Sequence, residues 1–381
     1  MIYFNLTCLG WEFDVNKIQQ QEMSSDIISC LSERIMRLPR SIQSALKVAA
    51  CLGSSFDLTV FQKATIHPVS IDEFITLATE NGLLYESSPN NYTWSHDQLH
   101  QAAYSLIPSN KKESTHLLIG SRIFLSSTSE EIQSYIHDIV RNMNIGMSHL
   151  RTQAQKVELA RLNLTAGEKS IKSSAFCSAS TYFSIGIVLL GDDWHVDNYD
   201  LAMKIFNLSA EMLIITGNSV LFQSTIEQSL IYARTFEDRL PSSHNLIRFL
   251  VSLGRLEEAL SHCFKLIREF GEPDFPSEVT PEIINEEIAK TELALANFPR
   301  SAEILGLPPL TDSMKVWLMK IMNSAMLLLF ATKAELASLL GCRMVQRSAE
   351  YGWSCDSAFG LYAFGHTLIS IKKNVDDGYF W

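Results

Sequence analysis

The sequence has 381 residues, of which 46% are hydrophobic and 19% are charged, and its formal net charge is -11. This length predicts more than one folded unit, and the apolar content excludes an intrinsically disordered chain. The negative net charge disfavours a general nucleic-acid-binding surface, because phosphate binding requires clustered Lys and Arg side chains.

Cysteines and apolar runs indicate a cytoplasmic protein. The seven cysteines are scattered, without a Cys-x-x-Cys motif, and most lie in apolar runs, which predicts reduced and buried thiols. The first ten residues lack the basic start and the long apolar centre of a signal peptide. The most apolar segment, residues 324–331, is much shorter than the roughly 20 residues that span a bilayer and therefore predicts a buried helix. The cysteines are Cys8, Cys30, Cys51, Cys177, Cys263, Cys342 and Cys355.

Residues 24–82 predict four consecutive helices with short connections. Apolar residues recur there at steps of three and four, which places them on one face of each helix. Caps, a proline break and glycine stops set the boundaries. In chain order these signals are residues 24–26, Pro39, Gly53, Asp57, the capping box Ser70 to Glu73, and Asn81-Gly82.

A β-hairpin and a further helix are predicted after these four helices. Residues 83–87 and 92–95 have an extended pattern, and Pro89-Asn-Asn91 between them is typical of a turn. The segment from His96 to Leu106 is helical in pattern and stops before Pro108. Helices, a hairpin wing and a closing helix, in that order, predict a winged-helix domain at residues 24–108.

Charge decides between two roles for such a domain, DNA binding and packing on a neighbouring part of the protein. A DNA-binding domain presents basic residues on the helix that enters the groove. The third and fourth predicted helices carry Lys63 as their only basic residue. Four acidic residues accompany it: Asp57, Asp72, Glu73 and Glu80. The packing role is therefore favoured, while Arg34, Arg37 and Arg40 on the first two helices keep DNA binding as an alternative.

Spacing typical of tetratricopeptide repeats (TPRs) occurs twice after residue 109. In such repeats a glycine ends the first helix, and small residues lie where the two helices touch. The first match is partial, because Cys263 replaces the usual aromatic residue and Leu266 the small one. It comprises Gly254, Leu256, Ala259, Cys263 and Leu266, and the second comprises Phe176, Ala179, Phe183 and Gly186.

The C-terminal third is predicted to continue this array. Helices are expected at residues 311–331, 332–352 and 354–373, and connections at 271–282 and 299–312. Three glycines are expected at the helix joints, namely Gly341, Gly352 and Gly360. The stacked helix pairs predict a curved superhelix with a concave partner-binding face. Aromatic residues at helical spacing are predicted to lie in its core: Phe176, Tyr182, Phe183, Phe206 and Phe222.

The order of several motifs resembles the predicted-ATPase module of large signalling proteins, a STAND-class relative of AAA ATPases. The resemblance covers nearly the whole chain. Its motifs are Trp11-Glu-Phe-Asp14, Arg37-Leu-Pro39, Leu46-Lys-Val-Ala-Ala-Cys-Leu-Gly-Ser-Ser-Phe56, Gly82-Leu-Leu84, His96-Asp97, Gln101-Ala-Ala-Tyr-Ser-Leu-Ile-Pro108, His116-Leu-Leu-Ile-Gly120, Leu162-Asn-Leu-Thr-Ala-Gly167, Ser174-Ala-Phe176, Leu189-Leu190, Trp194 and Tyr199-Asp-Leu201.

In that family an ATPase domain precedes a winged helix and a TPR-like superhelix, and protein-kinase, GAF or histidine-kinase domains often flank them. The resemblance thus implies three parts. Residues 1–23 would be the remnant of the ATPase lid, residues 24–108 the winged helix, and residues 109–381 a helical array that is truncated at its C-terminal end. His96-Asp97 would close the wing and cap the next helix.

No catalytic, cofactor-binding or metal-binding residue is predicted. The phosphate-binding motif G-x-x-x-x-G-K-[ST] does not occur, so ATP and magnesium are expected only through a missing upstream ATPase domain. The apolar run before Gly191-Asp-Asp193 is similar to a magnesium-binding strand, but it is better explained as a helix end. His96 and His100 have the spacing of a zinc pair, yet no third ligand lies nearby in the sequence.

The sequence therefore predicts a non-catalytic regulatory and protein-interaction module of a signal-transduction ATPase. We expect a protein or peptide partner on the helical array, an ATPase domain in cis or in trans, and no membrane. Two alternatives remain open. The chain could be a fragment of an ATPase or kinase enzyme whose catalytic part is missing, or a DNA-associated winged-helix regulator.

Overall fold

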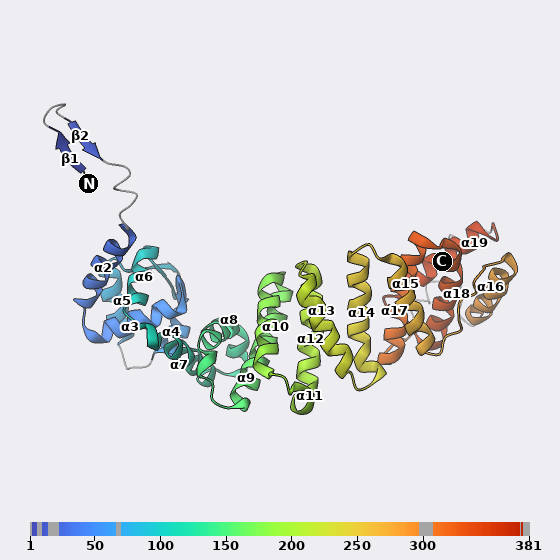
Figure 1. Cartoon of the computed structure of the whole chain (residues 1–381), viewed down its shortest axis with the longest axis horizontal. Helices are drawn as coiled ribbons and strands as arrows, with labels where there is room; N and C mark the ends of the chain where they lie inside the picture. The colour runs from blue at the N-terminus through green and yellow to red at the C-terminus, as the bar shows by residue number, and fades with distance from the viewer. Residues whose placement is uncertain are drawn as a thin grey trace. The chain divides into compact units, whose positions relative to one another are not determined.

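The computed structural model describes residues 2–5, 10–13, 23–65, 70–296, 308–373 and 375 (Figure 1). Across these residues the chain is mainly helical, with one two-stranded and one three-stranded antiparallel sheet. The chain divides into two compact units, unit 1 (Met1–Ala202) and unit 2 (Met203–Trp381). This division falls within the expected helical array, and the expected domain boundaries at residues 23 and 108 stay predictions.

Unit 1 contains both sheets and the helices up to α11. Its elements are β1 (Ile2–Asn5), β2 (Gly10–Phe13), α2 (Met23–Met36), α3 (Arg40–Leu52), β3 (Ser55–Asp57), α4 (Leu58–Ala64), α5 (Ile71–Glu80), β4 (Leu84–Ser88), β5 (Asn91–Trp94), α6 (Asp97–Ser105), η1 (Ser109–Lys111), α7 (Lys112–Leu125), α8 (Ser129–Ile145), η2 (Met147–His149), α9 (Gln153–Lys172), α10 (Phe176–Leu190) and α11 (Trp194–Asp197). Helix α12 (Tyr199–Ile215) begins before the division between the units and ends after it.

The expected helices and hairpin between residues 23 and 106 are confirmed. Asp57 caps α4 by accepting from the backbone N–H groups of Thr59 and Val60, and Ser70 caps α5 by accepting from that of Glu73. Gly53, at φ 111°, ends α3 in a backbone conformation that favours glycine. The first boundary was wrong by one turn, because α2 already begins at Met23 and includes the residues expected to cap it.

The sheet has one more strand than the hairpin that the sequence predicts. Strand β5 lies in the centre, with β4 paired to one edge and β3 to the other. In this register Phe56 of β3 faces Tyr92, and Leu84 of β4 faces Trp94. Burial of Phe56, Tyr92, Leu84 and Trp94 joins the sheet to the core that α3, α4 and α5 supply.

Helices α9 and α10 pack closely because a glycine faces an aromatic ring. A Cβ atom at Gly167 would lie 2.3 Å from the Phe183 ring, so the ring occupies the space that any larger residue would need. Phe183 and Ala179 are both fully buried. The small and aromatic positions noted in the sequence thus form the contact between the two helices.

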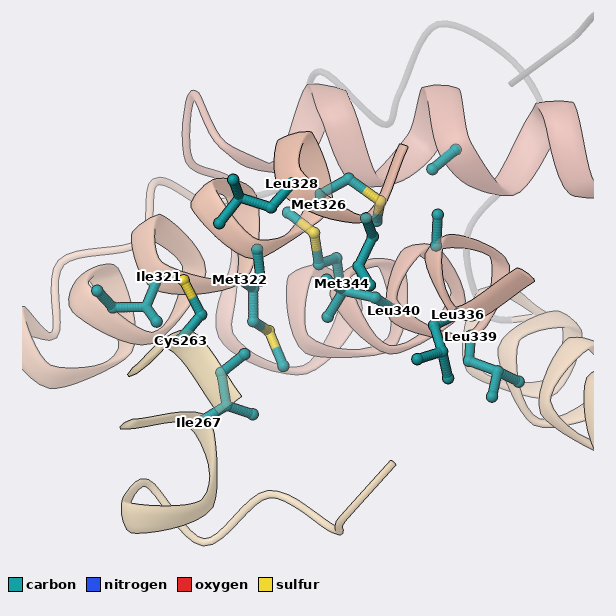
Figure 2. Packing of buried hydrophobic residues seen from close by; sticks show 14 of the residues in the cluster. Cys263, Ile267, Ile321, Met322, Met326, Leu328, Leu336, Leu339, Leu340 and Met344 are labelled. Atoms are coloured by element: carbon teal, nitrogen blue, oxygen red, sulfur yellow. The ribbon is translucent and has the colours of Figure 1, made fainter. Parts of the chain in front are cut away.

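Unit 2 consists of helices whose buried apolar residues form two clusters. Its elements after α12 are α13 (Ser219–Tyr232), α14 (Phe236–Ser252), α15 (Leu256–Glu269), α16 (Pro281–Leu295), α17 (Ser313–Thr332), α18 (Ala334–Tyr351) and α19 (Ser357–Ser370). The smaller cluster extends from α12 to α14 and the larger one from α14 to α19. Helix α15 packs on α14 and α17, and α18 packs on α16, α17 and α19. Figure 2 shows side chains of the core cluster, among them Cys263 and Ile267 from α15, Met322 from α17 and Leu340 from α18.

Two of the three C-terminal glycines lie inside helices, so the expectation that they mark joints was wrong. Gly341 is in the middle of α18 and Gly360 is in the first turn of α19, whereas Gly352 does end α18. A Cβ atom at Gly341 would lie 2.8 Å from Cβ of Ala363. One at Gly360 would lie 2.7 Å from Cβ of Met344. Both glycines therefore allow close helix packing instead of a turn.

The exchange Gly341→Ala should lower the free energy of unfolding by about 1–3 kcal/mol, because the added methyl group overpacks the contact with Ala363. Helix propensity alone predicts the opposite sign, a gain of about 1 kcal/mol. The double exchange Gly341→Ala with Ala363→Gly makes room for the methyl group and should recover most of the loss. Urea midpoints of the three proteins measure this, and an unchanged midpoint in Gly341→Ala would contradict the packing account.

The apolar segment predicted as a buried helix lies within α17. By length and composition α17 is the one described helix that could cross a membrane. Its residues Leu318, Met322, Ala325 and Leu329 are buried in the core of unit 2, whereas Leu327 and Phe330 are exposed, so the expectation of a buried helix holds for one face of α17.

Only part of the cysteine prediction holds. Burial raises the pKa of Cys51, Cys263 and Cys342 to about 12, so these thiols are protonated at neutral pH. Three others are exposed, namely Cys30, Cys177 and Cys355. An apolar run does not show which face of a helix a residue occupies, and that is why these three were predicted wrongly. Cys8 and residues 299–307 of an expected connection lie outside the described residues.

Candidate functional site

The candidate site is the junction at which α3, α4 and α6 meet α7 and α8 in unit 1. Helix α4 packs on α7, and α3 contacts both α7 and α8. All five helices belong to one compact unit. We call this set of contacts the junction, and its polar residues come from both sides of the boundary expected near residue 108.

A line of aromatic rings leads from β5 into the junction. The ring centroids of Trp94 and His100 are 5.7 Å apart, those of His100 and Tyr104 6.5 Å, and those of Tyr104 and His116 5.7 Å. His100 and Tyr104 are one helical turn apart on α6, and His116 lies on α7. The row therefore connects the sheet with α7 through one face of α6.

His116 is the polar centre of the junction and is almost fully buried. Its Nδ1 lies 2.8 Å from Oδ1 of Asn142 on α8, and its Nε2 lies 3.0 Å from the Tyr104 hydroxyl. Because Oδ1 of Asn142 can only accept, Nδ1–H of His116 donates to it. Nε2 then accepts from the Tyr104 hydroxyl, so the neutral imidazole satisfies both neighbours.

The surroundings of His116 favour this neutral form. Burial lowers the pKa of His116, and the charges of Arg141 and Lys112 lower it further, while the hydrogen bond to Asn142 acts in the opposite direction. The Lys112 ammonium group lies 4.3 Å from the centroid of the Tyr104 ring. At neutral pH a hydrogen-bonded chain of uncharged groups therefore joins α6, α7 and α8.

Lys63 fixes α4 to the start of α8. Its Nζ donates to the Ser126 carbonyl at 2.8 Å and pairs with Oε2 of Glu131 at 3.1 Å. The same carboxylate accepts from the backbone N–H of Thr128, completing the capping box of α8. The hydrogen bond from the Thr128 backbone lowers the pKa of Glu131 most, and the hydrogen bond from Lys63 lowers it further.

Arg141 on α8 reaches the end of α3. Its guanidinium group donates to the Leu52 carbonyl and to Oδ1 of Asp138. Burial raises the pKa of Asp138, and Arg141 partly offsets this. Among the basic residues that kept the DNA alternative open, Arg34 donates to the Asn81 carbonyl at 2.5 Å. Arg34, like Lys63 and Arg141, thus contacts the protein itself.

The two histidines with zinc-pair spacing have separate structural roles. His96 caps α6, because its Nδ1 accepts from the backbone N–H of Gln98, and His100 Nε2 lies 2.9 Å from the Ala50 carbonyl. The capping role that the resemblance implied for His96 is therefore seen. Among the described residues no group of three or more His, Cys, Asp or Glu side chains is placed to hold a metal ion.

The acidic segment after α10 follows a helix end, as interpreted from the sequence. Helix α10 stops at Leu190, Gly191 follows, and Asp193 precedes the short helix α11. Of the aromatic residues predicted to be core, Phe183, Phe206 and Phe222 are buried, while Phe176 and Tyr182 are half-buried. Phe222 stacks on Phe249 of α14 with ring centroids 4.1 Å apart.

Stability should fall as the pH drops below about 6.5, the ordinary pKa of histidine. The folded-state pKa of His116 is lowered, so the unfolded chain binds the proton more readily and acid favours unfolding. Each such group can contribute a slope of at most about 1.4 kcal/mol per pH unit. Urea unfolding between pH 5 and 8 measures this slope, which should be smaller in His116→Gln.

His244 and His137, whose pKa values burial also lowers, remain in that variant, so the difference between the two slopes isolates His116. The exposed Thr181 carries no titrating group and supplies the control, so Thr181→Ala should keep the original slope. Equal slopes in all three proteins would show that His116 does not titrate as its surroundings imply.

The protein is mainly helical, and in the junction the polar residues Lys63, His116 and Arg141 connect one helix to another. No family model matches the sequence, and no solved structure matches it. An alignment of 302 positions, which covers 62% of this chain, shows 23% identity to the protein named hybrid signal transduction histidine kinase G of Dictyostelium discoideum. The chain spans 9% of the length of that relative, and the similarity fits a role in signalling.

Proposed function

We propose that this chain is a non-catalytic regulatory and protein-interaction module of a cytoplasmic signal-transduction ATPase. In this proposal residues 24–108 form a winged-helix domain that passes the state of an ATPase domain to the helices after it. Those helices form a TPR-like array that binds a protein or peptide partner. The similarity to a signalling histidine kinase supports the signalling context.

The observation that carries this proposal is that Lys63 on α4 contacts the protein's own residues near the start of α8. This residue is the single basic side chain among the described residues of α4 and α5, and its ammonium group contacts Ser126 and Glu131. A phosphate backbone would have to compete with both oxygens for it. The charge of α4 therefore supports packing on α7 and α8 better than binding to DNA.

Element order and helix pairing support the two fold assignments within this proposal. Helices α2 to α5, the β4–β5 hairpin and α6 follow one another as in a winged helix, and β3 adds the third strand. In the TPR-like part, Gly254 lies between α14 and α15 at φ 72°, a conformation that favours glycine. Ala259 and Cys263 are then fully buried on α15.

Affinity purification of the tagged full chain from cells that express it tests the interaction role. We expect at least one protein to be retained reproducibly over a tag-only control, and the purified chain should neither hydrolyse Mg-ATP nor shift duplex DNA at low salt. ATP hydrolysis would favour the enzyme alternative, and a salt-dependent DNA shift would favour the DNA-associated regulator. Failure to retain any specific partner would contradict the proposal.

A further inference from the structure

A groove in unit 2 has the features of a binding site that the sequence did not reveal. It lies between α15, the start of α18 and residues 273–277, which we call the strap. Two adjoining hollows of about 240 and 480 Å³ share the lining residues Phe264, Arg268 and Lys333. Ile267 and Leu336 line the smaller hollow, which gives it an apolar floor continuous with the core cluster of Figure 2.

Several contacts hold the strap in place, so the groove has a preformed wall. Arg343 on α18 donates to the Pro273 carbonyl at 2.7 Å, and its guanidinium carbon lies 4.5 Å from the centroid of the Phe275 ring. That ring stacks on Phe264 of α15 with centroids 4.7 Å apart. A preformed wall lowers the ordering cost of binding a ligand.

The rim of the groove is basic, although the whole chain is acidic. Lys265, Arg268 and Lys333 are exposed there, against the carboxylates of Glu257 and Asp274. Lys265 makes no ion pair with the described residues. The other two cations have only exposed partners, with Arg268 2.6 Å from Asp274 and Lys333 3.7 Å from Glu257. Exposed pairs of this kind contribute little, so a ligand carboxylate can replace them.

We propose that this groove binds an acidic peptide segment that carries one apolar or aromatic side chain. The apolar side chain enters the smaller hollow against Phe264, Ile267 and Leu336, and flanking carboxylates pair with Lys265, Lys333 and Arg268. The apolar floor favours such a peptide over a bare phosphate group, which would gain nothing from it. This inference rests on the proposed interaction function and names the site and the chemical class of the partner.

A displayed peptide library tests the proposal with the full chain as bait. We expect enriched peptides that combine Asp or Glu with a single Leu, Phe or Trp. A fluorescein-labelled copy of one enriched peptide then measures affinity by anisotropy. Lys265→Glu with Lys333→Glu should weaken its binding at least tenfold, and raising the salt to 0.5 M should weaken it in the parent chain.

Two further variants keep the test interpretable. Lys111→Glu with Lys172→Glu makes the same total charge change at two exposed positions outside the groove and should leave the affinity unchanged. Ser261→Trp places a large side chain in the wider hollow without changing charge and should also weaken binding. Urea midpoints confirm that each variant is folded. The groove assignment is overturned if no acidic peptide is enriched, or if the folded groove variants bind as well as the parent.

Failure of this inference is distinguishable from failure of the proposed function. A partner that is purified with the full chain but is retained equally by the groove variants would remove the groove assignment and leave the interaction role standing. ATP hydrolysis by the purified chain would contradict the non-catalytic role, whatever the groove binds.

Discussion

Phe183→Ala should lower the free energy of unfolding by about 3–5 kcal/mol, the range measured when buried aromatic side chains are truncated. Phe183 is fully buried and fills the space above Gly167, so its removal leaves a cavity at the contact of α9 with α10. Helix α9 offers no larger side chain at this position to fill that cavity. Urea unfolding measures the loss, and hydrogen exchange of the α9 and α10 amides shows whether it originates there.

Thr181→Ala is the matched control, since Thr181 is exposed on the same helix and its hydroxyl contacts only the Cys177 carbonyl. Thr181→Ala should change the free energy of unfolding by no more than about 0.5 kcal/mol. A loss below about 1 kcal/mol in Phe183→Ala would show that α9 and α10 do not depend on this ring.

Arg347→Met should destabilise unit 2 by about 3–5 kcal/mol, the cost of leaving one partner of a buried ion pair without its counter-charge. The Glu272 side chain is only 4% exposed, and Arg347 contacts it through Nε at 2.6 Å and Nη2 at 3.1 Å. In this variant the buried Glu272 carboxylate would lack the counter-charge of Arg347, which destabilises the folded state. Because Glu272 precedes the strap, hydrogen exchange at residues 271–275 should rise together with the loss in urea midpoint.

The double variant Glu272→Gln with Arg347→Met removes both charges and should recover much of this loss. An exposed ion pair provides the comparison. Lys372→Met breaks the contact to Glu292, whose side chain is 51% exposed, and should cost less than about 1 kcal/mol. Equal losses in Lys372→Met and Arg347→Met would show that burial of Glu272 does not set the cost.

Local signals predicted most of the helix boundaries. The caps Asp57 and Ser70 and the stop at Asn81-Gly82 act within three or four residues, so the sequence alone identifies them. Strand β3 was missed because its three residues become a strand only by pairing with β5, some 35 positions later. The prediction for Gly341 and Gly360 was wrong because glycine occurs both where two helices pack closely and where a helix ends.

The junction could be recognised only in part. The charge pattern of α4 and α5 identifies Lys63, but its partner Glu131 lies 68 residues away in the chain. His116 belongs to a motif of the resemblance, and nothing near it in the sequence points to Asn142, 26 residues later. The groove was missed for the same reason, since α15, the strap and α18 come together only in the fold. Contacts between distant segments are not encoded in any local pattern.

The double use of Glu131 has a consequence for how the junction opens. Because one carboxylate both closes the first turn of α8 and holds the ammonium group of α4, detachment of α4 also loosens that turn. Fraying at residues 129–132 and release of α4 are therefore linked events. Amide exchange in this single turn would report, in the free protein, how often α4 detaches from α8.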